Sequence, residues 1–76
     1  MASEDTAMKA FHEAETALQT AIDEYNAANA AFEEACHSDP PTTAEVLKQL
    51  RQTQEAKRDA MLHASFMVEK ARVDLE

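Results

Sequence analysis

The sequence predicts an all-α fold, in which two long helices fold back on each other as an antiparallel, coiled-coil-like hairpin. Glycine is absent from the 76 residues, and the prolines are the adjacent pair Pro40 and Pro41. Apolar residues recur at alternating steps of three and four on both sides of that pair, which is the spacing of a helix with one apolar face. Because the length is about half that of a typical domain, we expect a single domain over 1–76.

The first predicted helix covers residues 4–37. Ser3 or Thr6 can cap its N-terminus, where the acidic Glu4 and Asp5 suit the positive end of the helix dipole. Its apolar seam predicts packing against a second helix. The seam consists of Met8, Phe11, Glu15, Leu18, Ile22, Tyr25, Asn29, Phe32 and Cys36.

A strip of alanines runs beside this seam, one every seven residues: Ala7, Ala14, Ala21, Ala28 and Ala35. Helix propensity alone would explain many alanines but not their regular spacing. Alanine has so little side-chain bulk that a neighbouring helix can approach closely along such a strip. We therefore interpret the strip as a packing surface.

Residues 38–41 form the predicted turn, because two consecutive prolines remove two backbone donors and disfavour helix in the residues before them. Thr42 and Glu45 match a capping box, in which each side chain bonds the backbone amide of the other residue. The second predicted helix covers 43–75. Its seam consists of Leu47, Leu50, Gln54, Lys57, Met61, Ala64, Val68 and Ala71, with Leu75 as a further candidate and Val46, Ala60 and Met67 widening it.

The middle of the predicted interface is polar. A hairpin folded at 38–41 would place each residue i opposite a residue near 79 minus i, so that Tyr25 meets Gln54. Asn29 and Lys57 lie next to this pair along the two seams. Polar layers of this kind fix the register and the number of helices at a cost in stability. We therefore predict a structural role for these four residues.

Charge is divided unequally between the two halves. Residues 1–39 carry nine acids and one base, whereas 40–76 carry six of each, which accounts for the formal net charge of −8. A solvated acidic surface and steering toward a basic partner both explain this division. Glu15 is an acid within the seam, opposite roughly Ala64. We expect it to reach solvent or to pair with a cation such as Arg72 or a partner's base.

Three further apolar residues cannot be used by a two-helix hairpin. Leu62, Phe66 and Val73 fall within about 40° of one another at 100° per residue, nearly opposite to the seam. A helix that is apolar on two sides needs a second neighbour. We predict that this line, with Met67 nearby, contacts a protein partner, either another copy in a four-helix assembly or a different protein.

Composition excludes several other classes of function. A net charge of −8 repels the phosphate backbone and anionic lipids, which argues against nucleic acid or membrane partners. The chain has one cysteine, no signal-like apolar segment and no apolar run long enough to cross a membrane. We therefore expect a cytoplasmic protein without cofactors.

Catalytic and metal chemistry also find little support in the sequence. Glu34 and His37 have the spacing of di-iron ligands, but they occupy outward positions and no second such pair follows. Cys36 and His37 are adjacent on a helix and point about 100° apart, so they cannot act as thiol and base. We expect no enzyme activity and no metal site.

The acidic helical hairpin, with its Pro40-Pro41 turn, its heptad seam and its unused Leu62, Phe66 and Val73, resembles the small co-chaperones of bacterial type III secretion, the YscE/PscE/AscE group. The resemblance is one of architecture over the whole chain. It implies a larger helical chaperone as partner, bound through that apolar line or through the alanine strip at Ala14, Ala21 and Ala28.

We therefore expect a non-enzymatic interaction module that is completed by a partner or by dimerisation. Its expected role is that of a small cytoplasmic chaperone, co-chaperone or adaptor. The alternative is a self-assembling structural protein, such as a homodimeric four-helix bundle or a secretion-needle-like subunit, since needle subunits are also hairpins with a proline-containing turn.

Overall fold

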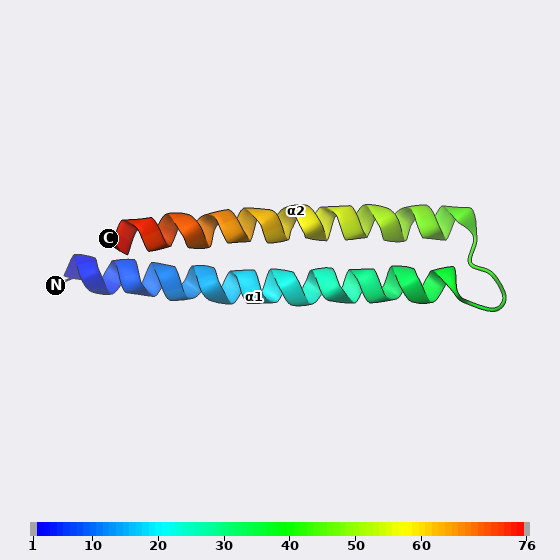
Figure 1. Ribbon diagram of the computed structural model, residues 1–76, viewed down its shortest axis with the longest axis horizontal. Coiled ribbons are helices and arrows are strands. Elements are labelled where there is room, and N and C mark those ends of the chain that lie inside the picture. Colours follow the sequence, from blue (N-terminus) through cyan, green and yellow to red (C-terminus); the bar gives the residue numbers. More distant parts are fainter. Residues whose placement is uncertain (1, 76) are drawn as a thin grey trace.

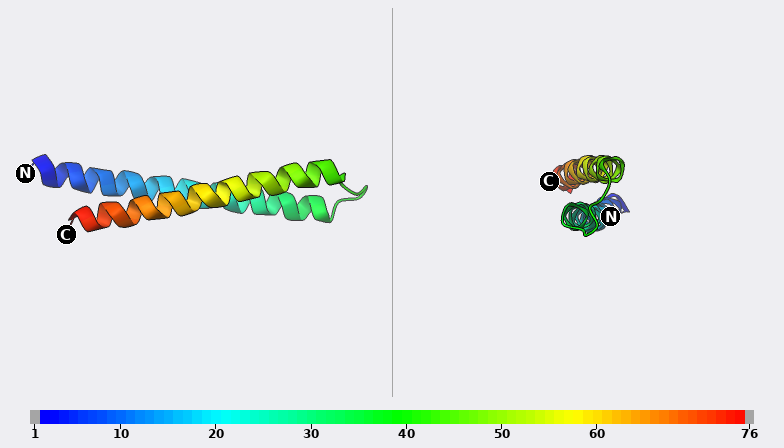
Figure 2. Two further views of the ribbon diagram at one scale, coloured as in Figure 1. Left: turned by 90° about the horizontal axis from the view of Figure 1, so that it is seen from above. Right: turned by 90° about the vertical axis from the view of Figure 1, so that its right-hand side faces the viewer.

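The computed structural model describes residues 2–75 and consists of two helices, α1 (Ala2–Cys36) and α2 (Ala44–Leu75). The helices lie antiparallel and side by side, with both ends of the chain at one end of the rod (Figure 1). The rod measures 60 × 14 × 13 Å. Seen from above, the helices cross near their middle (Figure 2). The predicted all-α hairpin is thus confirmed, while residues 1 and 76 lie outside the described part.

The helix ends differ slightly from the sequence prediction of 4–37 and 43–75. Since α1 begins at Ala2, Ser3 and Thr6 lie inside the helix and not at its N-terminal cap. At the other end, the Ser38 hydroxyl donates to the carbonyl of Ala35 at 3.0 Å. The backbone amide of His37 donates to the carbonyl of Glu34 at 3.2 Å. These bonds satisfy carbonyls that the end of the helix would otherwise leave unpaired.

The threonine that caps α2 differs from the one that the sequence predicts. Thr43, and not Thr42, caps α2, because its hydroxyl accepts a hydrogen bond from the amide of Val46 at 3.3 Å. The Thr42 hydroxyl instead donates to the carbonyl of Ala35 at 2.8 Å. The predicted capping box is therefore wrong: the residue three positions after Thr43 is a valine, which cannot return the bond.

The inward side of α1 alternates alanine with larger residues. Its half-buried positions are Ala7, Phe11, Ala14, Leu18, Ala21, Ile22, Tyr25, Ala28, Asn29, Phe32 and Ala35. Other alanines of the same helix, such as Ala10 and Ala17, are exposed. The alanine strip therefore packs against α2. Met8, Glu15 and Cys36, which the sequence analysis placed in the seam, are exposed.

The inward side of α2 agrees with the sequence analysis. The predicted positions from Leu47 to Ala71 are half-buried, and Ala64 is buried. The candidates at the margins of the seam are exposed: Val46, Ala60, Met67 and Leu75.

The register between the helices differs from the predicted one by about three residues. The side-chain amide of Gln54 donates to the side-chain carbonyl of Asn29, and the Lys57 amine lies 3.1 Å from a carboxylate oxygen of Glu24. The numbers in these pairs add to 83 and 81, so a residue i faces a residue near 82 minus i, not 79 minus i.

In the half of the hairpin away from the loop, complementary side-chain size agrees with this register. With a sum of 82, Ala14 faces Val68, Leu18 faces Ala64 and Ala21 faces Met61, so that bulk on one helix meets alanine on the other. The predicted sum of 79 would instead oppose two large residues, such as Leu18 and Met61, and would hold the helices apart. Close packing of the backbones therefore favours the observed register.

Candidate interaction surface

The hairpin has almost no interior. Ala64 is the one buried residue in the part of the chain whose side chains are described, with 9% of its surface exposed. Its register partner is Leu18, which remains half-buried. Two helices bury only one stripe each, so most apolar side chains stay partly in contact with water.

Leu62, Phe66 and Val73 form what we call the outer face of α2, on the side away from α1. Their exposed fractions are 55%, 64% and 57%. A shallow depression of about 280 Å³ lies beside this face, lined by Phe66, Glu69, Lys70, Val73 and Asp74. The exposure of these residues was predicted from the sequence. Their role as a partner-binding surface stays a prediction.

The other residues predicted to bind a partner lie in different surroundings. Met67 is exposed, at 41%, on a flank of α2. Ala14, Ala21 and Ala28 are half-buried on the side of α1 that packs against α2. The alanine strip is thus partly covered by the chain itself, and a partner could use it fully only by displacing α2.

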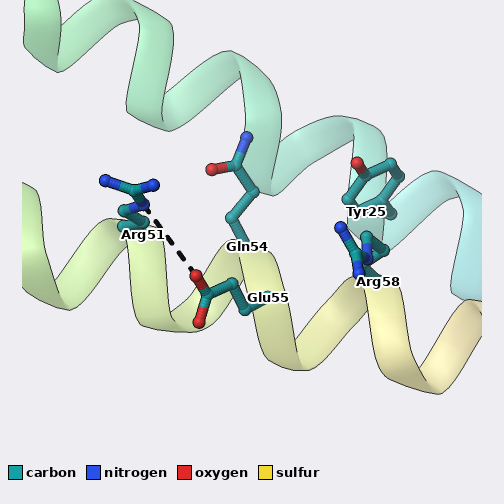
Figure 3. Close-up of a pocket in the computed structure, with 5 residues that line it drawn as sticks. All are labelled: Tyr25, Arg51, Gln54, Glu55 and Arg58. Atoms are coloured by element: carbon teal, nitrogen blue, oxygen red, sulfur yellow. Dashed lines mark ion pairs between the residues drawn. The ribbon is translucent and has the colours of Figure 1, made fainter.

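A polar pocket of about 250 Å³ lies near the middle of the hairpin (Figure 3). Tyr25 enters it from α1, while Arg51, Gln54, Glu55 and Arg58 enter it from α2. Gln54 also bonds Asn29, so the predicted polar layer exists around these residues. The sequence analysis missed the two arginines, although their spacing of seven places them on one side of the helix.

The ion pairs near this pocket lie at the surface. The Nε atom of Arg51 is 3.9 Å from a carboxylate oxygen of Glu55, and both side chains are largely exposed. Lys57 and Glu24 are more than two fifths exposed. Exposed pairs of this kind contribute at most about 1 kcal/mol each. They therefore add little to the stability of the hairpin.

Glu15 pairs within its own helix, with its carboxylate 3.5 Å from the Nδ1 atom of His12. Arg72, which we considered as its partner, pairs instead with Glu69 on α2. Glu15 and Arg72 thus both lie on solvated surface.

The residues considered for chemistry lie at the end of α1. Cys36 is an exposed free thiol, not a seam residue, and His37 beside it is also exposed. Among the described residues, no three His, Cys, Asp or Glu side chains come together as a set of metal ligands. Neither helix is apolar enough over a sufficient length to cross a membrane, as far as the described residues go.

Comparison with protein-family models, with curated proteins and with solved structures found no match to the chain. The similarity to the type III secretion co-chaperones therefore consists of the two-helix architecture and does not extend to an identified family.

Proposed function

We propose that this protein is a non-enzymatic protein-interaction module that acts in the cytoplasm as a small chaperone, co-chaperone or adaptor and binds its partner through the outer face of α2. One observation carries the proposal. Three large apolar side chains, each more than half exposed, lie on one line of a helix whose opposite side already packs on α1. Contiguous exposed apolar surface on a small protein is typical of a contact site.

The accessible surface supports an associated state. A compact monomer of 8.4 kDa exposes about 4,600 Å². This chain exposes 5855 Å². The difference of about 1,200 Å² exceeds the roughly 800 Å² per partner that a standard protein interface buries. The rod therefore has enough surface for a stable complex without losing its own hairpin contacts.

The outer face also offers sufficient binding energy. Fully burying a Leu, Phe or Val side chain contributes about 1.5–3 kcal/mol. These three residues are already partly covered by their own helix, so their joint contribution is several kcal/mol before the entropy of association is subtracted. A complex of moderate affinity can therefore form through this face.

Site-specific photo-crosslinking tests the proposal. We would place p-benzoylphenylalanine at position 66 and, as the control, at position 27, where the exposed Ala27 lies on the acidic outer side of α1. On irradiation in the cells that produce the protein, we expect a defined adduct from position 66 and none from position 27.

The mass of the adduct separates the candidate roles. An adduct with a different protein supports the adaptor role, whereas an adduct with the protein itself supports the self-assembling alternative. Equal labelling from both positions, or none from position 66, would contradict binding through the outer face.

A further inference from the structure

We propose that the outer face of α2 binds a second copy of this chain, and that the two α2 helices pack antiparallel about a two-fold axis near residue 64. The inference rests on the proposed function only in taking the outer face as a contact surface, and it assigns that face to a second copy, as in the self-assembling alternative. The charged residues beside this face support the inference, because they are complementary to the same residues of a second copy.

The apolar centre of the face is self-complementary. In a symmetric antiparallel contact, the numbers of facing residues add to a constant. If that constant is 128, Leu62 of each copy lies against Phe66 of the other. Two Leu–Phe contacts then form at the centre, one on each side of the two-fold axis, and Val73 of each copy lies over the side chain of Glu55.

Charged residues on one flank of the face agree with the same register. Arg58 and Glu69 are eleven residues apart, so at 100° per residue they lie within about 20° of each other around the helix. A two-fold axis perpendicular to both helices keeps each flank on its own side. Their numbers add to 127, so Arg58 of one copy comes beside Glu69 of the other, whose carboxylate also pairs with Arg72 of its own helix.

The opposite flank repeats the arrangement with the order of charges reversed. Asp59 and Lys70 are also eleven residues apart and share that flank. Their numbers add to 129, which places Asp59 of one copy beside Lys70 of the other. Neither residue takes part in an ion pair or hydrogen bond among residues 5–75 of the single chain, the part whose side chains are described. Both charges are therefore free for a contact between copies.

Net charge favours this face over the others. Residues 40–76 carry six acids and six bases, whereas 1–39 carry a net charge of −8. A contact through α2 brings two neutral helices together and leaves the two acidic helices on the outside. A contact through α1 would instead bring the acidic helices together.

A parallel pair has its two-fold axis along the helices, which exchanges the flanks, so that Arg58 lies beside Asp59 and Lys70 beside Glu69 of the other copy. Opposite charges therefore meet in both orientations, and the charge pattern favours a second copy as the partner. The pairing of Asp59 with Lys70 occurs only in the antiparallel orientation, so reversing both charges distinguishes the two.

Sedimentation equilibrium over a dilution series tests the proposal with the full chain. We expect a dimer for the unmodified protein and a monomer with unchanged helix content for Phe66→Asp. Asp59→Lys and Lys70→Asp should each raise the dimer dissociation constant about five- to thirtyfold, because each replaces two attractive contacts with repulsive ones. The double variant Asp59→Lys/Lys70→Asp should return to within about twofold of the unmodified protein, since it restores opposite charges.

Lys48→Asp is the matched control, because it makes the same change of charge as Lys70→Asp on the same helix. When the numbers of facing residues add to 128, residue 48 lies beyond the end of the second copy. The dissociation constant of the Lys48→Asp dimer should therefore stay within about twofold of the unmodified value.

A protein that is monomeric at all concentrations would overturn this inference. The proposed function would then be judged separately, by whether position 66 crosslinks to a different protein. A dimer that survives Phe66→Asp, that Lys48→Asp weakens as much as Lys70→Asp does, or that the double variant fails to restore would also contradict the arrangement.

Discussion

Ala64 shows how a single small side chain sets the distance between the helices. It is the one buried residue in the described side chains, and the observed register places it against Leu18. A larger residue at this position would have no space, because the facing side chain already occupies it. The methyl group of Ala64 therefore permits the close approach of α1 and α2 at this level.

Ala64→Leu should consequently destabilise the hairpin, although it makes the chain more hydrophobic. Overpacking of this kind costs about 1–3 kcal/mol. Urea denaturation followed by circular dichroism measures the loss. Ala60→Leu is the matched control, because Ala60 is exposed on the same helix and should leave the unfolding free energy nearly unchanged. Equal effects of the two substitutions would show that Ala64 does not set the helix spacing.

The two helices were predictable from the sequence to different degrees. In α2 the three-and-four spacing from Leu47 to Ala71 identified the packed side correctly. In α1 the spacing of the alanines identified their strip as a packing surface correctly, but Met8 and Cys36, which were also assigned to the seam, are exposed. The structure places alanines in the seam, because the size of the facing residue decides which positions can pack closely. Hydrophobicity alone does not contain that information.

The start of α2 depends on Thr43, whose hydroxyl satisfies the otherwise unpaired amide of Val46. Thr43→Ala should lower the unfolding free energy by about 0.5–2 kcal/mol. A thermal melt at fixed protein concentration measures the effect. Thr53→Ala is the control, because the Thr53 hydroxyl bonds a carbonyl within the helix and alanine has the higher helix propensity. A melting temperature that falls only for Thr53→Ala would contradict the assignment of the cap.

The outer face was predictable in part for the same geometric reason as the seam of α2. The angles of Leu62, Phe66 and Val73 around one helix follow from the sequence alone. The pocket formed by Tyr25 and Arg58 was not predictable, since it joins two helices and depends on their register. An error of about three residues in that register moves a facing residue by almost one helical turn.

For the whole molecule, the acidic charge of −8 opposes both folding and association. Raising the salt concentration from about 0.01 M to about 0.15 M shortens the Debye length from about 30 Å to about 8 Å. We expect the melting temperature to rise by about 4–8 °C, which corresponds to about 1 kcal/mol for a domain of this size. Circular dichroism at constant protein concentration measures this change.

Removing acidic charge from α1 provides the control for the salt experiment. In Asp23→Lys/Glu34→Lys, which changes two exposed residues of α1, the rise with salt should be smaller. A melting temperature that falls with salt in the unmodified protein would mean that attractive ion pairs outweigh the repulsion.

The placement of both chain ends at one end of the rod has a practical consequence (Figure 1). A fluorescent reporter fused at either terminus would lie close to Val73 and would shield the outer face of α2 from a protein partner. A small tag inserted between Ser38 and Pro41 would lie at the far end of the rod, beyond the reach of that face. Assays that label the protein should therefore carry the label in the loop.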